Sequence, residues 1–439
     1  MLSAGLDPAP RTYVAGVSLV RRAANGIASA PSSTTLADIE HWLLHEATRE
    51  KDWLVFLESF IWRLVVAGLP IDRVTLHMGT LHPQLVGFAW NWSSTDQLFD
   101  ELKIADAAAA SPSFLRNPIY RVFEYGETNR RDPRDPKAVE EFPLLADLAR
   151  EGYVDYIALP LSSSGRRNAM TIATRRGDGF TDVELKQLQP LISLFALHFE
   201  RHSALRISGN ALDAYIGAGA ATKVLAGSIK RGLGEAVQAV VWVADLRGFT
   251  ELSDRLQPAD LITLLNAYFE VMAGAVLRNG GDVLKFIGDG LLAVFPFESF
   301  ADAAAAAGAA LEAARDAQRG LEVLNTRPPA ELAAIEAWQP LRAGIALNEG
   351  EVFFGNIGAP ERLDFTVIGA AVNEASRVEA LQKTLKRNIL ITEAVARRLE
   401  GSLDHLGAHQ VRGVSAPISI YSPREELVDD RAAIALRSP

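Results

Sequence analysis

Two aspartates stand where carboxylates can meet at one edge of a sheet. Asp245 follows the apolar run Val237–Ala244, which predicts a buried strand, and Asp289 lies in a tight turn flanked by glycines. One helix between them would return the chain to the same sheet edge. Magnesium binds one or two carboxylates together with substrate phosphates. The pair therefore predicts a two-metal site that activates a hydroxyl and holds a triphosphate, although an Asp–Gly turn alone is usually only a turn.

Three further polar residues suit the same chemistry. Lys285 lies four residues before Asp289, and strand alternation places it on the same face of the predicted hairpin. Asn373 and Arg377 are spaced i, i+4, so they share one face of a helix. An amide and a guanidinium there can orient a ribose and stabilise a pentacovalent phosphate. Each of them alone would be read as an ordinary solvated residue.

The elements that must position these residues alternate regularly in the C-terminal half. A strand at 237–244, a helix from 258, a hairpin at 283–287 and 291–295, a helix at 300–324 and further strands at 341–347, 352–357 and 365–368 are expected. A helix at 371–385, a strand at 389–392 and a terminal pair near 410 and 418–421 follow. The order β-α-β-β-α-β predicts an α+β, ferredoxin-like sheet with helices on one face.

Three motifs occur in a fixed order: ADLRGFTELSDRL, GGDVLKFIGDGLLAVF and DFTVIGAAVNEASRVEAL. Together they resemble the class III adenylate/guanylate cyclase family. The resemblance implies a ferredoxin-like catalytic domain that works as a homodimer, with each active site shared between two chains. It also implies two Mg²⁺ or Mn²⁺ ions in each active site. By the same resemblance Asp245 and Asp289 match the metal-binding aspartates, and the main-chain carbonyl of Leu246 is a further metal ligand.

The resemblance also assigns the substrate-binding residues. Lys285 and Thr366 match the pair that reads the purine, Asn373 the residue that orients the ribose, and Arg377 the arginine that stabilises the transition state. Arg412 stands where relatives often carry a lysine that binds the triphosphate, and arginine keeps that charge.

The purine-reading pair favours ATP as the substrate. Lysine can donate to N1 of adenine and a threonine hydroxyl can accept from N6, whereas guanylate-cyclising relatives typically carry Glu at the lysine position. We therefore expect an adenylate cyclase that makes 3′,5′-cyclic AMP. A guanylate cyclase and a catalytically silent cyclase-like module are the alternatives. Silent relatives typically lose a metal aspartate or the arginine, and this chain has Asp245, Asp289 and Arg377. Relatives with Thr at the position of Thr366 include bicarbonate-responsive enzymes, which makes bicarbonate a candidate regulator.

The N-terminal half carries a different resemblance. The stretch YVDYIALPLSSSGRRNAMTIATRRGDGFTDVELKQLQPL is similar to the end of a GAF domain, with two strands, a GFTD helix start and a long exit helix. The resemblance implies a sensor or dimerisation module with a small-molecule ligand that the residues do not identify.

The exit helix, expected from Phe180 to about Leu205, repeats apolar residues in steps of three and four. The members are Leu185, Leu188, Ile192, Phe195, Phe199, His202 and Leu205. This a/d pattern predicts either a parallel coiled coil between two chains or a helix packed on its own sheet.

Composition limits the remaining possibilities. The net charge of −10 argues against broad nucleic-acid binding, and the absence of cysteine excludes disulfides and thiolate metal sites. No membrane span or signal peptide is apparent, so a cytoplasmic protein is expected. The expected domains are a flexible segment at 1–35, a GAF-like domain at 36–205, a helical connector at 206–236, a catalytic domain at 237–425 and a tail at 426–439.

Overall fold

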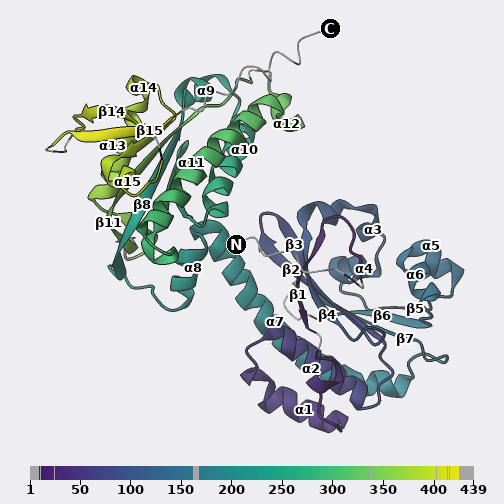
Figure 1. The fold of residues 1–439 in the computed structure, drawn as a ribbon. Coiled ribbons are helices and arrows are strands. Elements are labelled where there is room, and N and C mark those ends of the chain that lie inside the picture. Colours follow the sequence, from purple (N-terminus) through teal and green to yellow (C-terminus); the bar gives the residue numbers. More distant parts are fainter. Residues whose placement is uncertain are drawn as a thin grey trace. The chain divides into compact units, whose positions relative to one another are not determined.

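The structure is a computed structural model, and it describes residues 9, 11–23, 25–161, 168–336, 338–401, 403–412, 414 and 416–424. The tail expected at 426–439 lies outside these residues. The chain divides between Ala214 and Tyr215 into two compact units, within the stretch expected to be a connector. Each unit has its own sheet (Figure 1).

The N-terminal unit is built on a seven-stranded antiparallel sheet in the order β1-β4-β3-β2-β7-β6-β5. Its strands are β1 (Val17–Ala23), β2 (Arg73–His82), β3 (Leu85–Ser93), β4 (Phe99–Ala105), β5 (Asn129–Arg131), β6 (Asp155–Pro160) and β7 (Asn168–Thr174). Its helices are α1 (Leu36–His45), α2 (Trp53–Val66), α3 (Pro112–Leu115), α4 (Pro118–Tyr125), α5 (Pro136–Glu141), α6 (Leu144–Arg150) and α7 (Asp182–Ile216).

Side-chain alternation along the strands separates two cores in this unit. One face of the sheet packs against α1, α2 and α7 through a core rich in aromatic side chains. The other face packs against α4, α5 and α6 in a smaller core. In β6, for example, Ile157 joins the first core while Tyr156 and Ala158 join the second.

The helix that was expected to offer a coiled-coil seam is used inside its own unit. Phe195 and Phe199 are fully buried, and the Phe195 ring stacks on Phe60 of α2 at 4.2 Å between centroids. Leu188 is also buried in this core. Five of the seven a/d residues, from Leu185 to Phe199, therefore pack into the core of their own unit, which is the alternative that the spacing left open, whereas Leu205 is 60% exposed. The helix also runs to Ile216, beyond the predicted end at 205.

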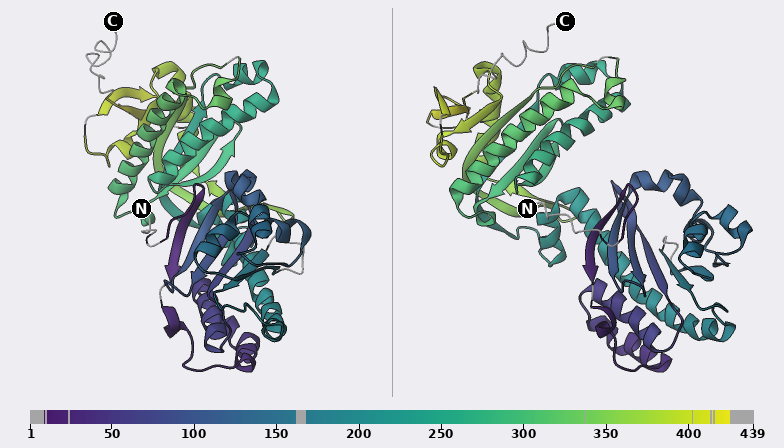
Figure 2. Two further views of the ribbon diagram at one scale, coloured as in Figure 1. Left: turned by 90° about the vertical axis from the view of Figure 1, so that its right-hand side faces the viewer. Right: turned by 45° about the vertical axis from the view of Figure 1, so that its right-hand side comes forward.

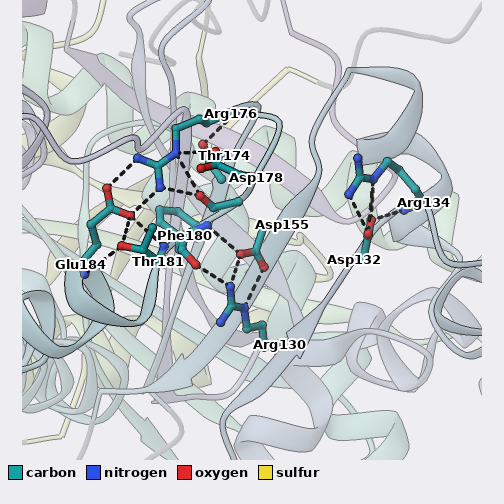
Figure 3. A network of polar contacts seen from close by, with 11 residues as sticks. Arg130, Asp132, Arg134, Asp155, Thr174, Arg176, Asp178, Phe180, Thr181 and Glu184 are labelled. Carbon is teal, nitrogen blue, oxygen red and sulfur yellow. Dashed lines mark hydrogen bonds and ion pairs between the residues drawn. The ribbon is translucent and has the colours of Figure 1, made fainter.

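A network of ion pairs and hydrogen bonds surrounds the start of α7 (Figure 3). Arg176 forms an ion pair with Glu184 in the first turn, with 2.5 Å between Nη2 and Oε2. Asp155 at the start of β6 accepts a hydrogen bond from the backbone N–H of Phe180 and forms an ion pair with Arg130. The network joins the beginning of the helix to the edge of the sheet.

Part of the segment expected to be flexible is ordered. Val17–Ala23 forms β1, which pairs with β4 at the edge of the sheet. Asp100 of β4 is fully buried and accepts hydrogen bonds from Arg22 and Tyr13 and from Arg11. The low-complexity composition hid these partners, because a strand held by ion pairs to a distant buried aspartate has no local periodic signal.

The C-terminal unit contains an eight-stranded sheet in the order β14-β15-β13-β11-β8-β10-β9, with β12 paired to β11. The strands are β8 (Gly234–Leu246), β9 (Asp282–Ile287), β10 (Gly290–Pro296), β11 (Ala343–Ala359), β12 (Arg362–Ile368), β13 (Ile389–Thr392), β14 (Leu403–His409) and β15 (Ile418–Pro423). The helices are α8 (Ala218–Leu225), α9 (Phe249–Arg255), α10 (Pro258–Arg278), α11 (Ala303–Thr326), α12 (Ala330–Ala333), α13 (Ala370–Ala380), α14 (Gln382–Leu385) and α15 (Glu393–Ala396). The run β8-α10-β9-β10-α11-β11, with β8 and β10 at the centre, is the expected ferredoxin-like arrangement.

Helices cover both faces of this sheet, not one face as expected. Helices α10 and α11 lie side by side on one face, where they bury Val240, Trp242 and Ala244 of β8 (Figure 2). Helices α8 and α13 pack on the opposite face against Ala239 and Val241. The alternating burial of β8 on both sides accounts for its continuous apolar sequence.

Helix α10 is long and apolar enough to cross a membrane by length and composition alone. In the structure its buried side belongs to the core of the C-terminal unit. Leu264, Tyr268 and Met272 are at most 1% exposed there. Packing against the sheet and α11 therefore explains why this long helix is apolar.

Candidate active site

The two predicted metal-binding aspartates lie together at one end of the central strands. Asp245 is the second-last residue of β8, and Asp289 is the second residue of the turn between β9 and β10. Gly288 has a φ of +61°, which allows the two-residue hairpin turn that presents Asp289. A Cβ atom on Gly290 would lie 3.6 Å from Oδ1 of Asp245, so this strand start passes close to the carboxylate.

The electrostatics of this pair favour a bound cation. Burial and the neighbouring Asp289 carboxylate raise the pKa of Asp245 to about 6. A cation between the two groups would remove that repulsion and favour both charged forms. Among the described residues no three His, Asp or Glu side chains converge as a metal cage. Two hard oxygen ligands with open positions fit Mg²⁺ or Mn²⁺ whose coordination is completed by substrate oxygens. Leu246, the third predicted ligand, is the last residue of β8.

A third carboxylate, missed in the sequence, lies close enough to this pair to interact with it electrostatically. Burial and the Asp245 carboxylate raise the pKa of Glu379 in α13 to about 7. A Cβ atom on Gly344 would lie 2.9 Å from Oε1 of Glu379, and Gly344 is the β11 partner of Asp245. Glu379 stands two residues after Arg377, off the face of α13 that carries Asn373 and Arg377. Its proximity to Asp245 becomes visible only when β8 pairs with β11, which places Gly344 opposite Asp245 and next to Glu379.

Tyr268 of α10 is a second missed residue near the carboxylates. Its ring is fully buried, and its hydroxyl has no hydrogen-bond partner within the described ranges. Burial and the charges of Asp245, Asp289 and Glu379 raise the pKa of this hydroxyl, which therefore stays protonated. Its place in an apolar helical repeat indicated only a core residue.

The predicted purine-reading residues come from two strands that approach each other. Lys285 of β9 forms an ion pair with Asp364 of β12. Thr366 is two residues further along β12, so it points to the same side of that strand as Asp364. Phe365 and Val367 point the other way into the core. Tertiary structure thus brings Lys285 close to the strand that carries Thr366, and it adds Asp364, which sequence reasoning had not singled out.

The remaining predicted residues have no polar partners in the described part of the chain. Asn373 is exposed near the start of α13, and Arg377 is half-buried one turn later. Arg412 is exposed in the loop before β15. No side-chain hydrogen bond or ion pair joins any of these three to another described residue. Their polar groups therefore remain free to bind a ligand or a second chain.

Comparison with known proteins decides the family of this half of the chain. Residues 235–422 match the family described as "Adenylate and Guanylate cyclase catalytic domain". The chain contains an adenylate/guanylate cyclase catalytic domain. The match includes Asp245, Asp289 and the other predicted site residues of the cyclase domain.

Individual relatives of the cyclase domain differ in their substrates. An adenylate cyclase of Anabaena cylindrica is 34% identical over 202 residues, which are 44% of this chain and 38% of the relative. The adenylyl cyclase CyaB from P. aeruginosa is 30% identical, with 45% of this chain and 98% of that chain covered and a TM-score of 0.40. The guanylyl cyclase Cya2 is also 30% identical, with coverage of 44% and 97% and a TM-score of 0.37.

The likeness to curated relatives is confined to part of their length. The matched part of the chain spans between 10% and 38% of the length of each of three curated relatives. The matched residues begin after the N-terminal unit, so the GAF-like assignment of that unit stays a prediction.

Proposed function

We propose that the cyclase domain converts ATP to 3′,5′-cyclic AMP and pyrophosphate. The main support is the coupled pair Asp245 and Asp289 in the same domain as Lys285, whose ammonium lies beside β12. In the reaction the 3′-hydroxyl oxygen forms a bond to the α-phosphorus. At the same time the bond breaks between the α-phosphorus and the oxygen that bridges the α- and β-phosphates. The hydroxyl proton is released and pyrophosphate leaves.

Each residue of the proposed site has a defined task. Lys285 donates to N1 of adenine, and Thr366 accepts from the N6 amino group. Asn373 orients the ribose, and Arg377 stabilises the charge that develops on the α-phosphate. Two Mg²⁺ or Mn²⁺ ions, held by Asp245, Asp289 and the Leu246 carbonyl, supply activation of the 3′-hydroxyl and neutralisation of the phosphates when bound. Arg412 binds the triphosphate.

We further propose that the active site is shared between two copies of the chain. Asn373 and Arg377 have no polar partner within the described residues, which supports a role toward a nucleotide held by another chain. The two strands that carry Lys285 and Thr366 also expose apolar side chains, with Phe286, Ile287 and Ile368 between 50% and 60% exposed. A second copy would cover such side chains. The N-terminal unit would regulate this pairing.

The purified 439-residue chain tests the reaction directly. It is incubated with ATP or GTP and with Mg²⁺ or Mn²⁺, and cyclic products are separated by chromatography. Cyclic AMP in excess over cyclic GMP is expected, because Lys285 and Thr366 match adenine. Predominant cyclic GMP would favour the guanylate cyclase alternative, and no product with either metal would favour a silent module.

Three variants test the metal site and the shared site. Asp289→Asn should lower kcat at least about 100-fold, because a metal ligand is lost, while the exposed control Asp254→Asn keeps full activity. Asp245→Asn and Arg377→Ala chains, each inactive alone, should recover part of the activity when mixed. Full activity of Asp289→Asn would refute the metal assignment, and failure of every mixture to recover activity would count against a shared site.

A further inference from the structure

The N-terminal unit contains a cavity that none of the residues discussed so far explains. Its volume is ≈ 240 Å³, and it lies between strands β2, β3 and β4 on one side and the short helices α3 and α4 on the other. An engineered apolar cavity of about 150 Å³ holds a benzene molecule, and pockets for drug-sized ligands start near 300 Å³. The space is therefore suited to a molecule of one or two rings.

The walls of this cavity are mainly apolar, and their polar residues are His77, Asn117, Ser111 and Ser113. Valine, isoleucine and phenylalanine side chains from β1, β3, β4, α3 and α4 dominate the lining, among them Val17, Val86, Ile104, Phe114 and Phe123. None of the described lining residues carries a charge. A ligand with a phosphate, carboxylate or ammonium group would bury an unpaired charge here at high cost. An occupant must therefore be electrically neutral.

One side chain gives the cavity a polar end. His77 of β2 lines it, and burial lowers the pKa of this ring to about 3, so the imidazole is neutral. Nε2 lies 2.9 Å from Oγ1 of Thr75, which in turn lies 2.7 Å from Oγ1 of Thr171. Nδ1 has no hydrogen-bond partner in the described part of the chain. The Thr75 contact holds the ring in place and leaves one nitrogen for a ligand.

A second polar group in the lining, Asn117, is also incompletely hydrogen-bonded. Asn117 caps α4, with Oδ1 accepting a hydrogen bond of 3.0 Å from the N–H of Ile119. Its amide nitrogen has no partner among the described residues. The cavity thus combines apolar walls with a few convergent polar groups, which is the usual composition of a small-molecule site.

We propose that this cavity binds an uncharged, largely aromatic molecule of one or two rings whose single polar group pairs with His77. The charge-free walls exclude nucleotides and other phosphorylated ligands. Such a ligand would stabilise the N-terminal unit, because it binds the folded state alone.

Binding of simple probes to the 439-residue chain tests this proposal. Benzene, indole and indole-3-carboxylate are compared by titration calorimetry at pH 7.5, where the last probe is an anion. Indole should bind more tightly than benzene because its N–H can pair with His77, and indole-3-carboxylate should bind at least about tenfold more weakly than indole. The readout is binding and not product, so the result stands whether or not the cyclase reaction is confirmed.

Matched variants locate the binding site. Val86→Phe adds a ring inside the cavity and should weaken indole at least about tenfold, whereas Leu81→Phe adds one at a position that is 70% exposed and should change nothing. His77→Phe keeps the ring but removes its nitrogens, so indole should weaken about fivefold to tenfold and benzene less than about twofold. Circular dichroism checks that each variant folds, and His77→Phe decides the question if Val86→Phe does not.

Three results would overturn the proposal. The first is that neither benzene nor indole binds the wild-type chain up to its solubility limit. The second is that indole-3-carboxylate binds as tightly as indole. The third is that a folded Val86→Phe or His77→Phe chain binds indole as the wild type does.

Discussion

Lys285 already has an ionic partner in its own chain. The ammonium of lysine has three N–H donors, so it can keep its contact with Asp364 while it donates to a purine nitrogen. Asp364 would then act as a positioning residue, since it restricts where a flexible lysine side chain points. The pair is exposed, with side-chain exposures of 41% and 57%, so its effect on stability is small.

Asp364→Asn tests this positioning role. We expect the KM for ATP to rise about threefold with kcat changed less than about twofold, because the lysine is less well ordered before substrate binds. The ratio of cyclic AMP to cyclic GMP formed should fall as well. Glu361→Gln, an exposed change in the turn before β12, is the control. An unchanged KM and an unchanged product ratio would show that Asp364 does not position Lys285.

At the scale of elements, helix α7 shows how one apolar pattern serves two different structures. Its heptad-like residues satisfy the spacing of a coiled coil, but the aromatic side chains of α2 occupy the same seam. The Phe195 ring contacts the rings of both Phe56 and Phe60, and the Phe199 ring contacts Trp53. Solvent-facing residues such as Leu197, which is 61% exposed, are the ones left over for any contact with another chain.

Truncation of one buried and one exposed residue of α7 distinguishes the two structures. Phe195→Ala should lower the free energy of unfolding by about 3–5 kcal/mol, because it leaves a cavity in the core of the N-terminal unit. Leu197→Ala should change it by less than about 0.5 kcal/mol. Denaturant titration followed by tryptophan fluorescence measures both. A small effect of Phe195→Ala on unfolding, together with a large effect on dimerisation, would support the coiled coil instead.

At the scale of the whole molecule, the chain consists of two units that each have a separate core, so each has its own stability. The N-terminal unit carries a specific sensitivity to acid. Burial, and then the positive charge of Arg73, lowers the pKa of His77 to about 3. Burial, and then the positive charges of Arg206 and Arg201, lowers the pKa of His202 to about 3. The His202 ring stacks on Trp53, with 4.0 Å between the ring centroids.

These two histidines predict how stability changes with pH. The unfolded chain takes up a proton at each histidine near pH 6.5, whereas the folded unit takes it up only near pH 3. Stability is therefore complete above about pH 6.5 and falls by up to about 1.4 kcal/mol per pH unit for each histidine as pH drops toward 3. His202→Phe, which keeps a ring against Trp53, should flatten this dependence between pH 7 and 5.

Thermal unfolding across that pH range measures the effect. Tryptophan fluorescence reports mainly on the N-terminal unit, which contains Trp42, Trp53, Trp62, Trp90 and Trp92. His45→Gln, a change at an exposed histidine of α1, is the matched control and should leave the slope unaltered. An equal slope in His202→Phe and in the wild type would mean that His202 is not held neutral.

Much of the C-terminal unit was predictable because its signals are local. The order of strands and helices and the glycine-flanked turn at Asp289 follow from hydrophobic periodicity and turn chemistry over short stretches of chain. The three motifs were sufficient to predict the cyclase family, which the match over residues 235–422 supports. The polar residues of the proposed site lie within or next to those motifs.

Only the tertiary structure decided which residues from distant elements meet. The pair Asp245 and Asp289 predicted a metal site, but the coupling of Asp245 to Glu379 depends on the pairing of β8 with β11 and on the glycine at position 344. Lys285 was identified from its strand, yet its partner Asp364 follows from the approach of β12. The sequence alone determined the types of side chain and their order along the chain. The structure decided their neighbours, because burial and electrostatic coupling depend on separations in space that no local spacing encodes.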